Sequence, residues 1–176
     1  VIPSIVKRLL KLFRKNIFVY EFDNLKLNIN LNEPMDQLIF FHNEYEKEQV
    51  IFLTNSIKDY SVNIFIDVGA NSGFYSLQIG KNFPDLKIIA YEPVKETFIK
   101  FEKNILLNKN TANINAYNLG LSDQNQSLQM KAKKKNGYVQ QGGFGIVNHN
   151  EITSSLHTEF ALFKRGDEEI DLKNNI

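Results

Sequence analysis

The sequence contains no cysteine, and this absence excludes disulfide bonds, thiolate zinc sites and cysteine nucleophiles. Histidine is scarce as well: His42, His149 and His157 are scattered along the chain, so we expect no metal site. No apolar run is long enough to span a membrane, and the first residues are too basic and too interrupted for a secretory signal. These absences are compatible with a cytoplasmic protein.

An excess of charge of one sign is also lacking. The chain has 21 Lys and Arg residues against 20 Asp and Glu residues, a net charge of +1. This balance gives no reason to expect a nucleic-acid partner. The 176 residues are 43% hydrophobic, which is sufficient for a core. Because the chain begins at Val1 rather than Met, we expect that its amino end is not the start of the gene product.

The first 60 residues have the pattern of an amino-terminal cap. Residues 5–18 predict a basic amphipathic helix, which either packs its apolar stripe on the domain or attaches to an anionic membrane surface. Residues 18–22 and 25–31 alternate apolar and polar side chains and predict a hairpin. A helix is predicted around residues 45–53, and residues 57–61 form a polar connection.

The segment IFIDVGANSGFYSL, residues 64–77, contains the pattern most typical of a binding site. An apolar strand leads into a turn with Gly69 and Gly73, and helical spacing resumes at Phe74. Asp67 breaks the apolar run at the carboxyl end of the strand, where open α/β sheets bind their ligands. Strand and helix then alternate over residues 64–68, 73–83, 86–91, 95–107 and 112–118, which predicts a parallel sheet.

The spacing of the glycines does not fit a dinucleotide fold. Such folds use GxGxxG to approach a pyrophosphate, whereas here residue 71 is Asn. The pattern DxGxxxG instead resembles the first motif of Rossmann-like methyltransferases, which bind S-adenosyl-L-methionine. An NAD-type enzyme is therefore disfavoured.

Three motifs in order narrow the resemblance. DVGANSGFYS (67–76), AYEPVKETFIKFEKNILLN (90–108) and NLGLSD (118–123) together resemble the FkbM family of S-adenosylmethionine-dependent methyltransferases. The resemblance runs from about Tyr45 to the end of the chain. It implies a partial Rossmann-like class I methyltransferase fold, α/β in three αβα layers, over residues 61–176. The acidic KIDVEG-like segment of the family has no match, so we expect the chain to stop before the fourth core strand.

The resemblance also implies the cofactor-binding residues. Asp67 and Asn71 would border the amino acid portion, beside backbone spared by Gly69 and Gly73, although a turn carboxylate and an Asx turn are the structural alternatives. Glu92, about twenty residues after the turn, would accept the ribose hydroxyls. Ser122 and Asp123, after the third strand, would hold the adenine. Phe74 would either line the pocket or belong to the core.

Two further patterns allow more than one interpretation. After Gln124 the chain predicts a hairpin excursion, with strands at 127–132 and 158–164 and a glycine-rich loop at 133–145 that is either a substrate-side loop or a plain surface hairpin. The lysine run at residues 131 and 133–135 either meets an acidic glycan or is a solvated face. Asn104 and Asn108 match the NxxLN pattern of the family, and we expect a structural role at the end of the helix.

The resemblance predicts O-methylation of a sugar or small-molecule hydroxyl. No catalytic residue is identified, because the three histidines are isolated and the acidic segment is missing. We therefore expect this chain to bind the cofactor without turnover on its own, and the alternative function is a truncated, non-catalytic binding or interaction module. Loss of the fourth strand would leave residues 64–68 at an edge, where pairing with a second copy predicts a homodimer.

Overall fold

A computed structural model describes residues 16–109, 113–135, 138–139, 143–146 and 156–170. Most of the predicted basic helix therefore lies outside the described residues. Its last two positions, Ile17 and Phe18, begin a strand instead of ending a helix. None of the helices in these ranges is both long and apolar enough to cross a membrane.

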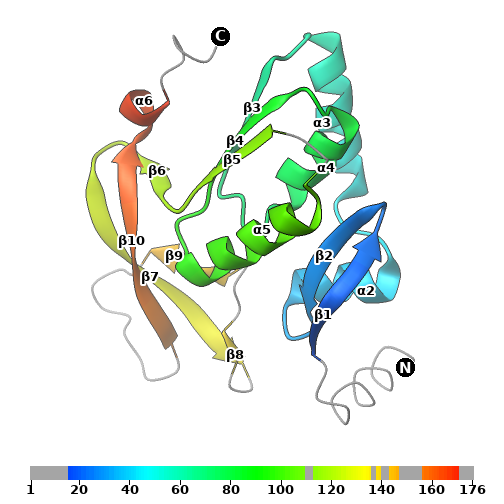
Figure 1. Cartoon of the computed structure of the whole chain (residues 1–176). Coiled ribbons are helices and arrows are strands. Elements are labelled where there is room, and N and C mark those ends of the chain that lie inside the picture. The colour runs from blue at the N-terminus through cyan, green and yellow to red at the C-terminus, as the bar shows by residue number, and fades with distance from the viewer. Residues whose placement is uncertain (1–15, 110–112, 136–137, 140–142, 147–155, 171–176) are drawn as a thin grey trace.

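A three-stranded parallel sheet forms the centre of the molecule (Figure 1). Its order is β3-β4-β5, with Val68 beside Tyr91 and Tyr91 beside Tyr117 at the carboxyl ends. One helix follows each of the first two strands, as the sequence predicts. The elements are β3 (Ile64–Val68), α4 (Phe74–Asn82), β4 (Lys87–Tyr91), α5 (Lys95–Leu107) and β5 (Asn113–Tyr117). This βαβαβ order makes the fold α/β and Rossmann-like.

Helices cover one face of this sheet. On that face Ile79 of α4 packs with Ile88 of β4, and Phe101 of α5 packs with Ala90. On the opposite face Ile89 and Tyr91 pack with Leu119, which follows β5, and with Ile170 at the end of the described chain. Apolar side chains on both faces explain why these strands read as nearly continuous hydrophobic runs.

The amino-terminal hairpin packs against the two helices of the core. Strands β1 (Ile17–Phe22) and β2 (Leu25–Asn30) pair in antiparallel register, and the apolar face of β2 meets Phe74 and Leu77 of α4. On the edge of β2, Lys26 donates its N–H to Asn108 Oδ1 (2.9 Å) and accepts from Asn108 Nδ2 (2.7 Å). A buried ion pair between Asp36 and Lys100 adds a second link to α5.

Two helices, not one, connect the hairpin to the sheet. They are α2 (Pro34–His42) and α3 (Lys47–Asp59). The predicted connection at residues 57–61 is therefore wrong over its first part, because α3 continues to Asp59. Ile57 is buried in that last turn against Ile79 and Ile88. Because the residues around Ile57 are polar, the hydrophobic pattern of the sequence does not show that the helix continues to this point.

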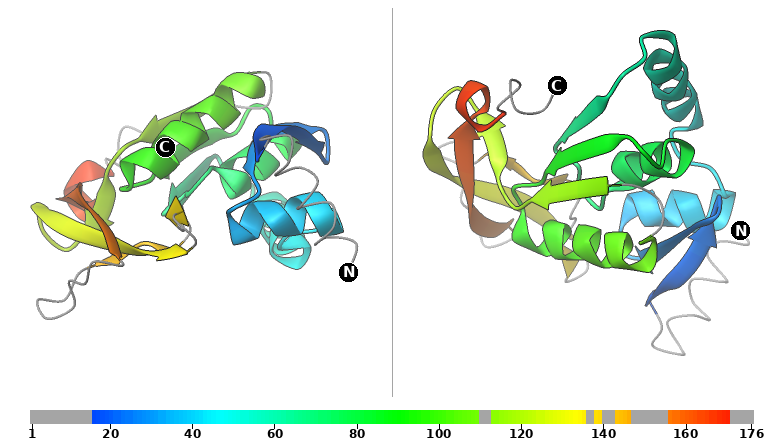
Figure 2. Two further views of the ribbon diagram at one scale, coloured as in Figure 1. Left: turned by 90° about the horizontal axis from the view of Figure 1, so that it is seen from below. Right: turned by 45° about the horizontal axis from the view of Figure 1, so that its top comes forward.

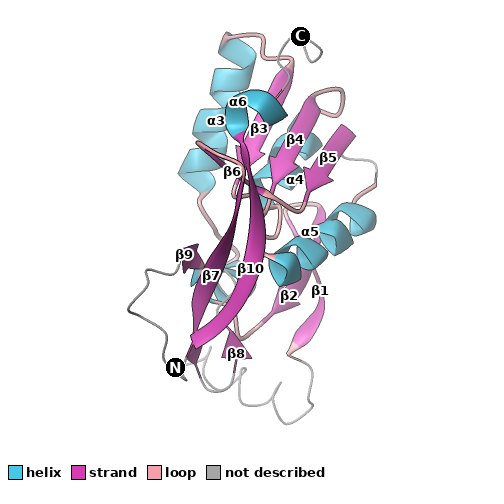
Figure 3. Cartoon of the chain, turned by 90° about the vertical axis from the view of Figure 1, so that its left-hand side faces the viewer, coloured by secondary structure: helices cyan, strands magenta, loops and turns pink. Residues whose placement is uncertain are grey.

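A second sheet follows the parallel one and confirms the hairpin excursion (Figures 2 and 3). Its two long strands pair antiparallel along their length, and the last of them also pairs parallel with a short strand after β5. The elements are β6 (Gly120–Ser122), β7 (Gln126–Lys135), β8 (Tyr138–Val139), β9 (Gly145–Ile146), β10 (Leu156–Arg165) and α6 (Gly166–Glu169). Strand β10 does not join β3, so within the described ranges β3 is an edge strand.

Candidate functional site

The glycine turn is tied to the end of the neighbouring strand. Gly69 and Ala70 both donate their N–H groups to the carbonyl of Tyr91, at 2.8 and 2.9 Å. Gly69, Asn71 and Gly73 all have positive φ angles (80°, 52° and 82°), a conformation that glycine and asparagine tolerate best. These bonds hold the turn at the carboxyl end of β4.

Glu92 meets this turn directly. Its Oε2 accepts the N–H of Asn71 at 2.8 Å, and its Oε1 accepts the N–H of Val94 at 2.8 Å. Burial raises the pKa of Glu92 above its ordinary value, the two N–H donors oppose that shift, and the charges of Asp67 and Glu159 add to it. An ionised carboxylate has about four acceptor positions, so about two remain for other donors. A vicinal diol supplies two donors of this kind.

Asp67 is buried behind the turn. Its Oδ2 accepts a hydrogen bond from Ser76 Oγ at 2.7 Å, which links the end of β3 to the first turn of α4. Burial raises the pKa of the Asp67 carboxyl, and the hydrogen bonds from Ser76 lower it. Asp67 therefore anchors the first turn of α4 to the end of β3 through Ser76.

The two glycines of the turn have different surroundings. A Cβ built at Gly69 meets no atom within 4 Å, so open space adjoins the backbone there. A Cβ at Gly73 would lie 2.0 Å from the ring of Phe101. The prediction that both glycines spare room for a cofactor therefore needs correction, because the room at Gly73 is filled by α5.

Phe74 belongs to the core. Its ring packs on Phe22 and Tyr45 in the cluster under the hairpin. It also lines a cleft of about 370 Å³ between the hairpin, α3 and α4. Beside it, Tyr75 donates its hydroxyl to Glu46, and burial together with Glu46 raises the pKa of Tyr75. A cofactor contact for Phe74 stays a prediction that this core packing does not favour.

Ser122 and Asp123 form the turn from β6 into β7. Ser122 Oγ lies within hydrogen-bond distance of Asp123 Oδ1 (3.2 Å) and of the carbonyl oxygen of Gln124 (3.1 Å), and Asp123 is exposed. Among the described residues, no hydrogen bond or ion pair joins either of them to Glu92. Asn118 makes that link instead, because its Nδ2 donates to the carbonyl of Glu92 at 2.9 Å. Asn118 lies in the NLGLSD motif, but the motif gave no role to it.

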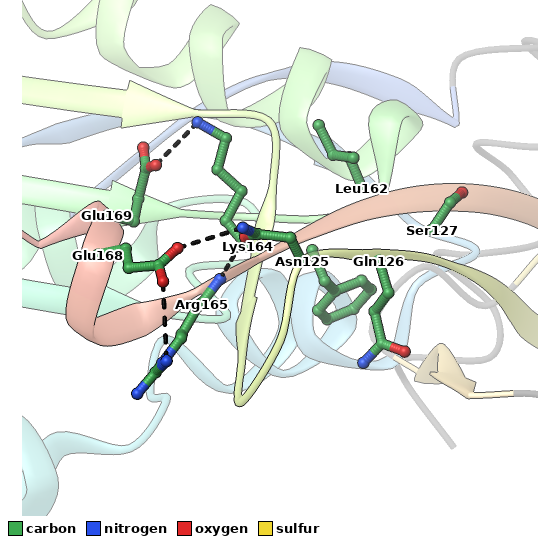
Figure 4. A pocket seen from close by; sticks show the side chains of 9 residues that line it. Asn125, Gln126, Ser127, Leu162, Lys164, Arg165, Glu168 and Glu169 are labelled. Carbon is green, nitrogen blue, oxygen red and sulfur yellow. Dashed lines mark hydrogen bonds and ion pairs between the residues drawn. The ribbon is translucent and has the colours of Figure 1, made fainter.

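A second, open cleft of about 520 Å³ lies where β7 begins and β10 ends, beside α6 (Figure 4). Its charged side chains bind one another: Lys164 Nζ lies 2.8 Å from Glu169, and Arg165 lies 3.7 Å from Glu168. Asn125 Nδ2 also donates to Glu168, at 3.2 Å. These internal pairs fasten α6 to the hairpin, so the cleft offers few uncommitted groups to a ligand.

His157 is less isolated than its place in the sequence indicates. It lies on β10 with its Nε2 3.9 Å from Glu159, and its ring meets the edge of Phe144. Glu159 Oε1 accepts the N–H of Lys95 at 2.8 Å, at the start of α5. In the described part of the chain, no group of three or more acidic or histidine side chains is arranged to hold a metal ion.

A parallel sheet whose first strand enters a glycine turn, with a buried carboxylate after the second strand, is the arrangement of a Rossmann-like α/β fold. No family model matches the chain. Methyltransferase 1 of Beauveria bassiana is 30% identical over 104 residues, which cover 54% of this chain and 41% of that protein. Methyltransferase sdnD of Sordaria araneosa is 32% identical over 65 residues, covering 37% and 25%. AMB antimetabolite synthetase AmbE of Pseudomonas aeruginosa is 29% identical over 97 residues, covering 55% and 4%.

The chain thus spans less than half the length of the curated relatives it matches. Two of them are named as methyltransferases, and their matched segments support a methyltransferase type of fold here. Among solved structures, a provisionally described transferase of Pyrococcus horikoshii has a TM-score of 0.47 and 18% identity, covering 67% of this chain and 47% of its own. A provisionally described O-methyltransferase of Klebsiella pneumoniae has a TM-score of 0.38 and 13% identity, covering 42% and 34%. This likeness is too slight to carry a function to this chain.

Proposed function

We propose that this chain is the cofactor-binding part of an S-adenosylmethionine-dependent methyltransferase of the FkbM type. The observation that carries the proposal is the carboxylate of Glu92, held between the N–H groups of Asn71 and Val94. It is buried at the carboxyl edge of the sheet with acceptor positions to spare. Two relatives are named as methyltransferases, which agrees with this proposal.

The residues present fit this cofactor. Glu92 would accept the two ribose hydroxyls, and its burial strengthens such bonds because water does not compete for them. The open space beside Gly69 would admit the amino acid portion close to the backbone, next to Asp67 and Asn71. Ser122 and Asp123 remain the proposed adenine neighbours. The bound cofactor supplies an electrophilic methyl group on a sulfonium.

We infer a hydroxyl of a sugar or other small molecule as the acceptor. Transfer to oxygen needs the acceptor in line with the methyl group and a group that takes the hydroxyl proton. The names of the relatives identify no acceptor. The acceptor class therefore rests on the family resemblance of the three motifs.

Calorimetric titration of the 176-residue protein tests the proposal. We expect binding of S-adenosylhomocysteine and no binding of NAD⁺. The Glu92→Gln variant should bind S-adenosylhomocysteine at least tenfold more weakly, because it loses the charge and one acceptor. Glu96→Gln is the matched control, since Glu96 is an exposed carboxylate in the first turn of α5. Wild-type protein that prefers NAD⁺, or that binds neither, would contradict the proposal.

A further inference from the structure

The imidazole of His157 carries one of the buried polar atoms that have no partner in the described part of the chain. Nε2 of His157 is buried from solvent and makes no hydrogen bond. The nearest carboxylate oxygen, Oε2 of Glu159, is 3.9 Å away, which is beyond hydrogen-bond distance. Buried polar atoms in folded proteins nearly always have partners, so an orphan of this kind calls for an explanation.

His157 lies on the face of β10 that packs toward the start of α5. Alternate residues of β10 share a face, and two of them, Ala161 and Phe163, pack with Val94 just before α5. His157 lies on the same face of that strand. The strand therefore turns this row of side chains toward the segment that begins with Glu92.

Glu159 connects strand β10 to the start of α5. Its Oε1 is fixed by the N–H of Lys95 at 2.8 Å, three residues after Glu92 in the chain. The charge of Glu159 also acts on Glu92, whose pKa it raises. Glu159 thus lies near His157 on one side and near Glu92 on the other, at the start of α5. The ring of Phe144 packs nearly perpendicular to the imidazole ring of His157.

We propose that His157 and Glu159 form the wall of the cofactor pocket that faces Glu92, and that Nε2 of His157 hydrogen-bonds the ribose side of the bound nucleoside. This inference rests on the proposed function. A vicinal diol fits the group because both hydroxyls can donate to the carboxylate of Glu92 while the oxygen of one of them accepts from the Nε2–H tautomer of the imidazole. Binding would then provide the partner that the buried Nε2 lacks.

The test is calorimetric titration of the full chain with S-adenosylhomocysteine and, separately, with adenosine. His157→Phe keeps a ring against Phe144 and removes Nε2, so both affinities should fall about tenfold. His157→Gln restores a polar group near the position of Nε2 and should stay within about threefold of the wild type. Phe160→Thr is the control, because Phe160 is 72% exposed on the outer face of the same strand, and its affinities should be unchanged.

A second measurement does not depend on ligand binding by any variant. In a ¹H–¹⁵N spectrum of the imidazole nitrogens, with His157 assigned by its absence in His157→Gln, adding S-adenosylhomocysteine should shift the Nε2 signal. Unchanged affinity in His157→Phe, or loss of S-adenosylhomocysteine binding without loss of adenosine binding, would overturn the inference. If His157→Phe does not fold, an unmoved Nε2 signal in the wild type overturns it. Wild-type protein that fails to bind S-adenosylhomocysteine would instead refute the proposed function, and this inference with it.

Discussion

Asn104 donates its side-chain amide to the main-chain carbonyl of Ser72, inside the glycine turn, at 2.8 Å. The same side chain accepts the N–H of Asn28 on β2 at 2.8 Å. One buried amide therefore joins the amino-terminal hairpin, α5 and the turn. The turn depends for its shape on a hairpin that lies far from it in the sequence.

Asn104→Ala should lower the free energy of unfolding by about 2–4 kcal/mol, because it leaves the N–H of Asn28 and the carbonyl of Ser72 without partners. Urea unfolding followed by circular dichroism measures the change. Lys103→Ala, at an exposed position one residue earlier on the same helix, is the control. A change of less than 0.5 kcal/mol in Asn104→Ala would show that water replaces the amide.

Gly73→Ala should destabilise the fold more than Gly69→Ala does. Both positions have positive φ angles near 80°, so the backbone strain of an alanine is nearly the same at each. Only the Cβ at residue 73 collides with Phe101, and such overpacking costs about 1–3 kcal/mol. The difference between the two unfolding free energies isolates this contact. Equal destabilisation would mean that α5 moves away at little cost.

Gly69→Ala should act on the ligand instead. Its Cβ enters the open space beside the turn, so we expect weaker binding of S-adenosylhomocysteine at a smaller loss of stability than in Gly73→Ala. Titration of both variants with that ligand checks this. The prediction fails if Gly69→Ala binds as tightly as the wild type.

Asp67 should make stability fall as the pH rises. Burial raises its pKa above the ordinary value of 3.8, so the native protein holds this proton more tightly than the unfolded chain does. Its contribution is therefore most favourable below pH 3.8 and is lost as the pH rises through the higher native pKa. Asp67→Asn removes this loss while its amide oxygen still accepts from Ser76.

Unfolding free energies of Asp67→Asn and the wild type, measured from pH 4 to pH 8, should diverge with rising pH in favour of the variant. Asp59→Asn, at an exposed position at the end of α3, should follow the wild type throughout. Parallel curves for Asp67→Asn and the wild type would contradict the prediction.

The free edge of β3 should promote self-association. Within the described ranges β3 pairs only with β4, and Val68 at its end is 58% exposed. An unpaired strand edge is a template for another strand, and a lysine on it is an effective block. Sedimentation velocity should therefore show less dimer for Val68→Lys than for the wild type, while Ile99→Lys on α5 leaves the dimer unchanged. Slow hydrogen exchange throughout residues 64–68 in a verified monomer would show that another segment covers the edge.

The sequence was sufficient for the parallel sheet because β3 and β4 are compact, largely apolar runs with a glycine or a proline shortly after them, and strand and helix patterns alternate regularly up to β5. The meeting of Glu92 with the glycine turn followed from the same logic, since parallel neighbours end at one edge. The contact of Gly73 with Phe101 was not predictable, because no local pattern says which helix a glycine approaches. The surroundings of His157 were unpredictable for a similar reason, as its ring meets Phe144, which lies outside the local pattern of β10, just before β9.

Asn104 on α5 and Asn108, which caps the carboxyl end of that helix, lie four residues apart, and they bind Asn28 and Lys26, which lie two residues apart on β2. Four residues of helix rise about 6 Å, and two residues of strand rise about 6.6 Å. The repeat of the helix therefore nearly matches the repeat of the strand, and the two asparagine amides stand where an adjacent strand would present its own peptide groups. A row of side chains on a helix thus acts as the missing neighbour of β2, so this edge of the hairpin is closed to the strand pairing that β3 leaves open.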